Sequence, residues 1–287
     1  MDKKYTIDDF LDKQAWQLLF NQMPIGAMLR NLGSLTELGV LRADAGDNLR
    51  RVEAVLNNKE HLRKGRIHPI DVLQALKTYE SGGRLGRSQK TWNPVPRIVD
   101  ILETAVELSF EVVEPTGKVF MHAVDVSGSM SSLVADMGLS CCEIATTMAL
   151  VTAKAEKNYT IRGFATDFRN LDITAKDSFN SAVRKASNQN FGGTDASVAY
   201  DWMIKHKFKA DVVCFWTDSE SWAGYKHPSQ ALAEYRKKVN RNVKAVYVTL
   251  APYRISLVDP NDPLSWDLAG FDPNTPRVIQ MLATGEL

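Results

Sequence analysis

Hydrophobic positions in the first part of the chain recur at helical spacing. Residues 6–23 place apolar side chains three and four positions apart, behind Thr6 and two acids that suit a helix start. Residues 68–83 run from a His-Pro pair to two glycines, the residue types that open and close helices. A similar apolar period spans residues 93–110, again with proline near its start. The pattern therefore predicts a series of short helices, typical of a helical-repeat segment, over residues 1–110.

From residue 118 onward the pattern changes to apolar runs of strand length that alternate with amphipathic helices. The predicted strands are KVFMHAVDV (118–126), YTIRGFA (159–165), ADVVCFWTD (210–218) and VKAVYVTLA (243–251). This alternation predicts an α/β domain over residues 118–287, with a doubly wound parallel sheet covered by helices on both faces. Pro115 and Gly117 make residues 111–117 the predicted linker.

Composition and charge narrow the class of protein. The 287 residues are 44% hydrophobic and 24% charged, a profile typical of a globular protein with a sizeable core. A formal net charge of +1 means that nucleic acid or a membrane can be bound only through a local patch. Cys141, Cys142 and Cys214 show neither a disulfide framework nor a zinc spacing. No apolar run is long enough to span a bilayer, and the first residues are too polar for a signal peptide. We therefore expect a cytoplasmic protein with reduced cysteines and no membrane partner.

The segment AVDVSGSM (123–130) carries three oxygen-bearing side chains after the first predicted strand. Asp125, Ser127 and Ser129 follow one another at intervals of two residues. Such side chains at a strand end can hold a metal ion, supply a nucleophile or cap the next helix. The turn lacks the G-x-S-x-G pattern of a serine nucleophile, and His122 is expected to lie inside the strand as a packed core residue. The sequence therefore argues against an enzyme and leaves metal binding and helix capping open.

Two further segments end in oxygen-bearing side chains that could reach the same ligand. Thr194 follows Gly192 and Gly193, and Asp218 follows the apolar run that ends at Thr217. Ligands of open α/β sheets bind at the carboxyl ends of the strands, where both segments are expected to lie. Two carboxylates and three hydroxyls form an all-oxygen donor set, which suits a hard cation such as Mg²⁺. So few carboxylates would leave the cation able to attract an acidic side chain of a partner protein.

The order of these residues resembles the metal-ion-dependent adhesion site (MIDAS) of the von Willebrand factor A family. Asp125, Ser127, Ser129, Thr194 and Asp218 match its five positions. The segments EPTGKVFMHAVDVSGSM, GGTDAS, FWTDSESWAG and HPSQALAEYRKK resemble one branch, the TROVE-domain RNA-binding or Ro family. In the first half, MPIGAMLRNLGSLT, RIHPIDVLQALKTYESG and LGRSQKTWNP are similar to the last repeats of the TROVE module. The resemblance implies an A domain that holds Mg²⁺ or another divalent cation through those five residues.

The same resemblance implies binding of small structured or misfolded RNA by helical repeats, of which this chain shows only the closing ones. Between Arg50 and Arg97 there are eleven Lys or Arg residues and four acids. Cations can meet phosphates and aromatic rings can stack on bases of single-stranded RNA, although such a run also suits an ordinary solvated helix face. The candidate RNA-contacting residues are Arg63, Lys64, Arg66, His68, Arg84, Arg87, Lys90 and Trp92.

Two functions follow from these observations. The first is a ribonucleoprotein component of the Ro type with a metal-dependent ligand site in its A domain. The second is a metal-dependent protein-interaction module without RNA binding of its own. The salt dependence of RNA affinity separates them, because phosphate contacts release counterions.

Overall fold

The structure is a computed structural model of the chain. It describes residues 13–83, 90–134, 137–187, 189, 193–218, 224–251, 257–272 and 274–287. These residues form a helical unit that ends at Val113 and an α/β unit that begins at Glu114. The change from one unit to the other falls inside the segment 111–117, where the sequence predicts a linker.

The helical unit is a bundle of short helices around a common apolar core. Its described helices are α1 (Lys13–Asn21), α2 (Ile25–Glu37), α3 (Gly46–Leu56), α4 (Lys59–Lys64), α5 (Pro69–Glu80) and α6 (Pro96–Phe110). Helix α6 packs against α3 and α5, and α2 packs against α5. Apolar side chains at helical spacing, such as Leu32 and Leu35 of α2 and Ile98 and Leu102 of α6, are almost fully buried. Each such side chain contributes about 1.5–3 kcal/mol to folding when it leaves water.

The α/β unit is built on one sheet, with the strand order β3-β2-β1-β4-β5-β6 among the residues described. The strands are β1 (Phe120–Asp125), β2 (Tyr159–Phe164), β3 (Phe168–Asn170), β4 (Val212–Thr217), β5 (Lys244–Thr249) and β6 (Ser265–Ala269). All neighbouring strands run parallel except β2 and β3, which are antiparallel. Strands β1 and β4 are buried along their whole length, which explains their near-continuous apolar sequences.

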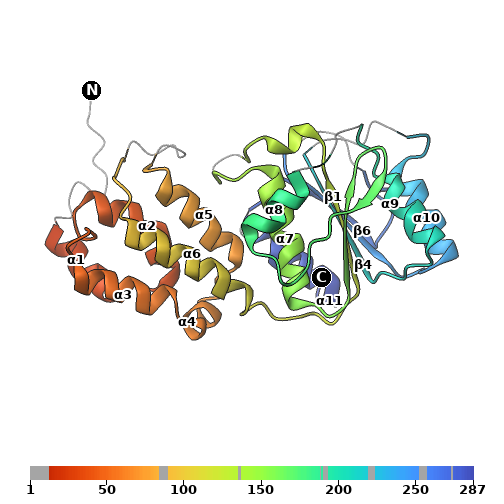
Figure 1. Cartoon of the computed structure of the whole chain (residues 1–287). Helices are drawn as coiled ribbons and strands as arrows, with labels where there is room; N and C mark the ends of the chain where they lie inside the picture. Colours follow the sequence, from red (N-terminus) through yellow and green to blue (C-terminus); the bar gives the residue numbers. More distant parts are fainter. Residues whose placement is uncertain are drawn as a thin grey trace, which may run out of the picture. The chain divides into compact units, whose positions relative to one another are not determined.

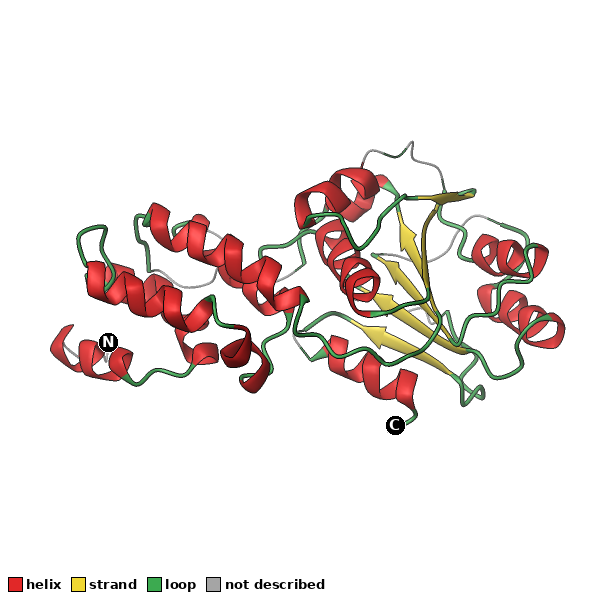
Figure 2. Ribbon diagram, turned by 60° about the horizontal axis from the view of Figure 1, so that its bottom comes forward, coloured by secondary structure: helices red, strands yellow, loops and turns green. Residues whose placement is uncertain are grey.

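Helices cover both faces of this sheet (Figures 1 and 2). One face carries α7 (Cys141–Ala155), α8 (Phe179–Ser187) and α11 (Thr275–Thr284), and the other carries α9 (Ser197–Lys205) and α10 (Pro228–Lys238). Under α9 and α10, Phe215 of β4 stacks on Tyr247 of β5, and the Tyr247 and Tyr200 hydroxyls lie 2.6 Å apart. The doubly wound α/β architecture expected from the sequence, preceded by a smaller helical segment, is confirmed.

Two strands of the sheet do not appear in the sequence pattern. The segment of β3 is only three residues long and partly exposed, and in β6, at the opposite edge, only Ser265 is buried while the other residues are partly or fully exposed. An edge strand has a neighbouring strand on one side only, and its side chains are less covered by helices than those of a central strand. Edge strands therefore lack the continuous apolar run that is typical of central strands. They extend the sheet beyond the four strands that the sequence predicts.

His122 of β1 is a packed core residue, as its place inside the strand suggests. Its ring Nδ1 accepts a hydrogen bond of 2.9 Å from the Trp216 indole, and its Nε2 lies 2.8 Å from the Thr152 hydroxyl. Burial lowers the pKa of His122 to about 3. The ring is therefore neutral at physiological pH, and both of its nitrogens contact side chains of the core.

The three cysteines are free and buried, in agreement with the sequence prediction. Burial raises the pKa of Cys214 to about 12, so this residue is a thiol at neutral pH. None of the helices described is both long enough and apolar enough to cross a membrane.

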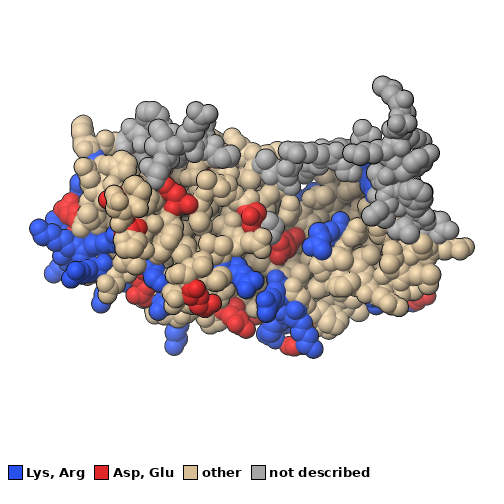
Figure 3. All heavy atoms as spheres, turned by 180° about the vertical axis from the view of Figure 1, so that it is seen from behind, with Lys and Arg blue, Asp and Glu red and all other residues tan. Residues whose placement is uncertain are grey.

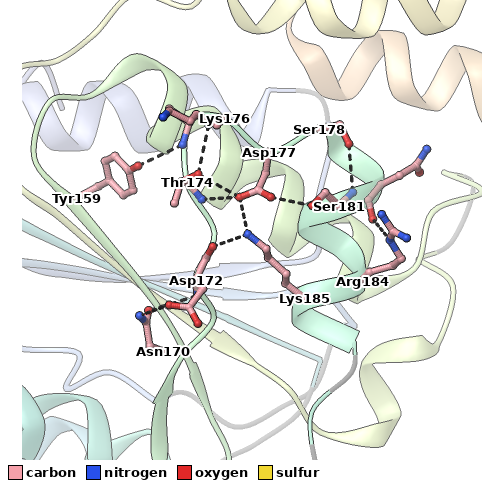
Figure 4. A network of polar contacts seen from close by, with 12 residues as sticks. Tyr159, Asn170, Asp172, Thr174, Lys176, Asp177, Ser178, Ser181, Arg184 and Lys185 are labelled. Atoms are coloured by element: carbon pink, nitrogen blue, oxygen red, sulfur yellow. Dashed lines mark hydrogen bonds and ion pairs between the residues drawn. The ribbon is translucent and has the colours of Figure 1, made fainter.

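A polar network fixes the chain between β3 and α8 (Figure 4). The Asp177 carboxylate accepts hydrogen bonds from the Thr174 backbone N–H, the Ser181 hydroxyl and the Lys185 ammonium, at 2.8, 2.7 and 2.8 Å. Burial by itself would raise the pKa of Asp177, but these hydrogen bonds and the Lys185 charge lower it to about 2. The network thus anchors α8, which precedes the loop of Thr194.

We expect Asp177→Asn to lower the free energy of unfolding by about 1–3 kcal/mol, because an amide cannot accept all of these hydrogen bonds. Since the folded-state pKa is lowered, the wild-type contribution is full above the ordinary value of 3.8 and disappears as the pH falls towards 2. Urea unfolding should therefore show a larger difference at neutral pH than at about pH 3. Asp172→Asn, at an exposed position of the same loop, is the control; an equal effect there would contradict this interpretation.

Candidate metal centre

Four of the five predicted metal ligands lie at the carboxyl ends of two adjacent strands, β1 and β4, and the fifth, Thr194, lies in the loop that precedes α9. The chain leaves β1 to form β2 on one side and later returns to form β4 on the other. Ligand sites of open α/β sheets lie at such points, because the loops diverge there and leave a crevice. The fold therefore supplies the position at which a site is expected.

Asp125 is the central residue of this group. It is the last residue of β1 and is fully buried. Its Oδ1 accepts a hydrogen bond of 2.8 Å from the Ser127 backbone N–H, and its Oδ2 accepts one of 2.7 Å from the Thr217 hydroxyl. These two bonds hold the carboxylate in one orientation at the strand end.

Ser127 and Ser129 lie in the turn that follows β1. Their hydroxyl oxygens are 3.1 Å apart, so the spacing of two residues does bring these side chains together. Ser129 belongs to a short 3₁₀ helix, Gly128–Ser131, and neither serine side chain caps it. The capping interpretation of this turn is therefore wrong for the helix that directly follows.

Asp218 follows the last residue of β4 and is 5% exposed. Its Oδ1 is buried and has no hydrogen-bond partner among the residues described. Burial raises the pKa of Asp125, the hydrogen bonds from Thr217 and Ser127 oppose this, and the neighbouring Asp218 charge raises it further. No Lys or Arg of the described chain forms an ion pair with either carboxylate. Two buried carboxylates without a cation are costly, and a bound divalent cation would offset that cost.

Thr194 belongs to the same edge of the sheet through β2. The backbone N–H of its neighbour Asp195 donates a hydrogen bond of 2.9 Å to the carbonyl of Ala165, the residue after β2. Thr194 itself is 8% exposed. Gly192, which precedes this loop, lies outside the described residues. The structure thus places four of the predicted ligands directly after β1 and β4, and it holds the loop of the fifth, Thr194, against the end of β2.

The chemistry of the donor set fits a hard cation. The donors are carboxylates and hydroxyls, which Mg²⁺ prefers. Burial, and then the charge of Asp218, raise the pKa of the nearby Cys141 to about 12, so this residue is a thiol in the metal-free protein. In the described part of the chain, no cluster of three or more His, Cys, Asp or Glu side chains could hold a metal instead.

Thr217 is a member of the site that the sequence does not assign. Its hydroxyl orients Asp125, and β1 and β4 pair so that the two residues face each other across the strand ends. The available signal was a polar residue at the end of a fully apolar run. Only the pairing of β1 with β4 shows that its hydroxyl donates a hydrogen bond to the Asp125 carboxylate.

The candidate RNA-contacting residues lie on the helical unit, and they differ in exposure and in the contacts that their side chains already make. Arg63, Lys64 and Arg66 are exposed at the end of α4, and Arg63 pairs with Glu60 at 2.6 Å. Exposed ion pairs of this kind contribute little to stability, so Arg63 can leave Glu60 and bind a phosphate group at little energetic cost. Arg84 and Arg87 lie outside the described residues.

His68 and Trp92 have structural roles. The His68 ring accepts a hydrogen bond from the Ile70 N–H and caps α5, and burial lowers its pKa to about 4. The Trp92 indole donates to the Tyr79 carbonyl at 3.0 Å and stacks on the Tyr79 ring. A Cβ added to Gly33 would lie 2.5 Å from the Trp92 ring, so this glycine makes room for it.

Lys90 lies 3.4 Å from the Ser34 hydroxyl and is partly exposed. An RNA contact of Lys90, His68 or Trp92 stays a prediction. The exposed end of α4 is the better-placed part of the candidate set.

Comparisons with known proteins agree with this organisation. Residues 119–283 match the Ro60 vWA domain family, and residues 11–88 match the TROVE domain family. The RNA-binding protein RO60 of Deinococcus radiodurans is 38% identical over 262 residues, which are 91% of this chain and 49% of that protein. The RNA-binding protein RO60 of Caenorhabditis elegans is 34% identical over 277 residues, 96% of this chain and 42% of that protein.

A solved structure is also similar. The crystal structure of the Deinococcus radiodurans RO (RSR) protein matches with a TM-score of 0.89 and 35% identity, over 98% of this chain and 59% of that one. The chain thus spans about half the length of the curated relatives it matches.

Proposed function

Because this chain belongs to the Ro family of TROVE and von Willebrand factor A domain proteins, we propose that it binds RNA and holds a divalent cation in its A domain. The observation that carries the RNA function is its 38% identity, over 91% of its length, to a relative named an RNA-binding protein. The RNA class that the family resemblance implies is small structured or misfolded RNA. Arg63, Lys64 and Arg66 would contact its phosphates from the end of α4.

The proposed metal is Mg²⁺, held by Asp125, Ser127, Ser129, Thr194 and Asp218 directly or through water. The supporting observation is the buried Asp218 Oδ1, which has no partner among the described residues and lies beside the buried Asp125. When bound, the cation would supply a coordination position for an acidic side chain of a partner protein. Thr217 and the Ser127 N–H orient the Asp125 carboxylate for this purpose.

The RNA function is tested by titrating the full chain into a labelled structured RNA with a free single-stranded end, across a range of salt and with or without Mg²⁺. The logarithm of the affinity should fall linearly with the logarithm of the salt concentration, by about 0.7 per phosphate contact on a single strand. Absence of binding at the lowest salt would overturn the RNA function.

A second candidate is a metal-dependent protein-interaction module without RNA binding. The observation that favours it is that the chain spans only about half of its curated relatives, which bear the RNA-binding name as longer proteins. A Mg²⁺-dependent stabilisation together with no RNA binding would favour this candidate. For both, the three buried free thiols fit the reducing cytoplasm as the proposed compartment.

A further inference from the structure

Exposed cations gather on the α/β unit at the edge of the sheet opposite the metal centre. We define this basic edge by Lys205, Lys207, Lys209, Lys237 and Arg241, all of which are exposed. The three lysines lie at the end of α9 and in the loop that enters β4, and the other two lie at the end of α10 and in the loop that enters β5. In Figure 3, Lys and Arg side chains cluster at the left, over the end of the unit that carries α9 and α10.

Hydrogen bonds hold these two segments together. The Tyr235 hydroxyl of α10 donates to the Phe208 carbonyl at 2.8 Å and accepts from the Ala210 N–H at 3.0 Å. The Asn240 side chain donates to the Ala210 carbonyl at 2.6 Å. The loop between α9 and β4 is therefore fixed against the end of α10, so the cations of both segments share one surface.

None of the cations of the basic edge forms an ion pair within the described part of the chain. By contrast, two neighbouring cations, one just before α10 and one at its end, do form ion pairs. Lys226 contacts Asp201 and Glu234, and Lys238 contacts Glu234. Asp211, the acid of the loop that enters β4, accepts a hydrogen bond of 2.9 Å from the Val119 backbone N–H instead of pairing with a cation. The acids of this region thus all have other partners, and the five cations of the basic edge keep an excess of positive charge.

Helix ends explain part of this arrangement but not all of it. Cations in the last turn of a helix are favoured by its dipole, which accounts for Lys205 and Lys237. Lys207, Lys209 and Arg241 lie beyond the helices. Lys207 also has a φ of 51°, a left-handed conformation in which glycine is the usual residue and other residues cost about 1–2 kcal/mol. A lysine at this position is therefore not explained by local folding.

The chemistry of the surface fits a polyanion with planar bases. The large exposed hydrophobic residues of the described chain are Leu18, Leu19, Leu133, Tyr225 and Leu287, none of which belongs to the basic edge. A protein partner usually requires an apolar centre in its interface, which this surface lacks. Beside the lysines, the exposed His206 ring stacks on Trp202 with centroids 4.5 Å apart. Trp202 is itself packed against Arg162, Phe168 and Phe208, so the His206 ring is the member of this pair that can stack on a base.

We propose that the basic edge binds the phosphate backbone of single-stranded RNA, so that the A domain contributes an RNA-contacting surface of its own. This inference rests on the proposed RNA function and adds a surface on the α/β unit to the helical one. The amino ends of β4 and β5 carry this surface, whereas the carboxyl ends of β1 and β4 carry the metal ligands. Loss of one should therefore leave the other intact.

The test compares two charge-neutralised variants of the full chain with a labelled single-stranded oligouridine and with the structured RNA. The first variant combines Lys205→Gln, Lys207→Gly and Lys209→Gln, with glycine chosen because it suits the positive φ of that position. The matched control combines Lys157→Gln, Lys176→Gln and Arg184→Gln, three exposed cations elsewhere on the same unit. Both variants lose the same charge, and thermal unfolding verifies that both fold.

The first variant should bind about tenfold more weakly at low salt, with a salt slope reduced by about 2, because about 0.7 is lost per phosphate contact. The control variant should bind like the wild type. Equal losses in both variants would reduce the effect to overall charge and overturn the inference. Unchanged affinity in the first variant would also overturn it. If the wild type binds no RNA at all, the proposed function itself fails, which is a distinct result.

Discussion

Asp218→Asn abolishes the stabilisation of the protein by Mg²⁺ and leaves the metal-free protein at least as stable as the wild type. This is the expected result because the Asp218 carboxylate is buried beside Asp125, and its Oδ1 has no hydrogen-bond partner among the described residues. The amide keeps the shape and removes one of two repelling charges, but it supplies a weaker metal ligand. In the wild type, Mg²⁺ at one hundred times its Kd should add about 2.7 kcal/mol to the free energy of unfolding. Thermal unfolding with and without MgCl₂ measures both effects.

Asp125→Ala should also abolish the stabilisation by Mg²⁺, but unlike Asp218→Asn it should destabilise the metal-free protein. Its removal leaves the Thr217 hydroxyl and the Ser127 N–H without their acceptor, so the metal-free protein should lose about 1–3 kcal/mol.

Serine variants supply the matched control. Ser129→Ala should weaken the Mg²⁺ response, whereas Ser131→Ala, two residues further along the same turn, should keep it. The Ser131 hydroxyl donates to the Gly128 carbonyl and is not among the predicted ligands. An unchanged Mg²⁺ response in Asp218→Asn and Ser129→Ala would refute the metal centre.

Reversal of the charges of Arg63, Lys64 and Arg66 to glutamate should weaken RNA binding by at least about tenfold at low salt. Three phosphate contacts would be lost, so the salt slope should fall by about 2. The three residues lie at the exposed end of α4, and their replacement removes only the surface pair with Glu60, so the fold and the Mg²⁺ response should persist. Anisotropy of a labelled structured RNA and thermal unfolding provide the two readouts.

The matched control reverses Lys13, Arg42 and Arg50, three exposed cations on other parts of the helical unit. Arg66 can also be replaced by glycine, which suits its φ of 51° and removes its charge without strain. RNA affinity equal to that of the wild type in the α4 variant would remove this surface from the proposed function. An equal loss in the control would show that only overall charge matters.

The local patterns of the sequence were sufficient for the architecture of the central sheet. Long apolar runs predict β1, β4 and β5, because a strand buried on both faces needs apolar residues at nearly every position. The more polar β2 is predicted from its strand-forming residues between two helical segments. The turn after β1 follows from Asp125, Ser127 and Ser129 in the same way, because side chains two residues apart at a strand end remain neighbours. These features depend on residues that are close in the chain, so they can be derived from the sequence.

Contacts between distant residues were decided only by the tertiary structure. The hydrogen bond from Thr217 to Asp125 requires the pairing of β1 with β4, and the packing of Trp92 against Gly33 requires the segment before α6 to return to α2. Edge strands β3 and β6 form because central strands offer them backbone partners, although their own residues are partly exposed. The basic edge exists because Tyr235 and Asn240 fix the two loops together. Packing of the whole chain determines such distances, and no local pattern in the sequence encodes them.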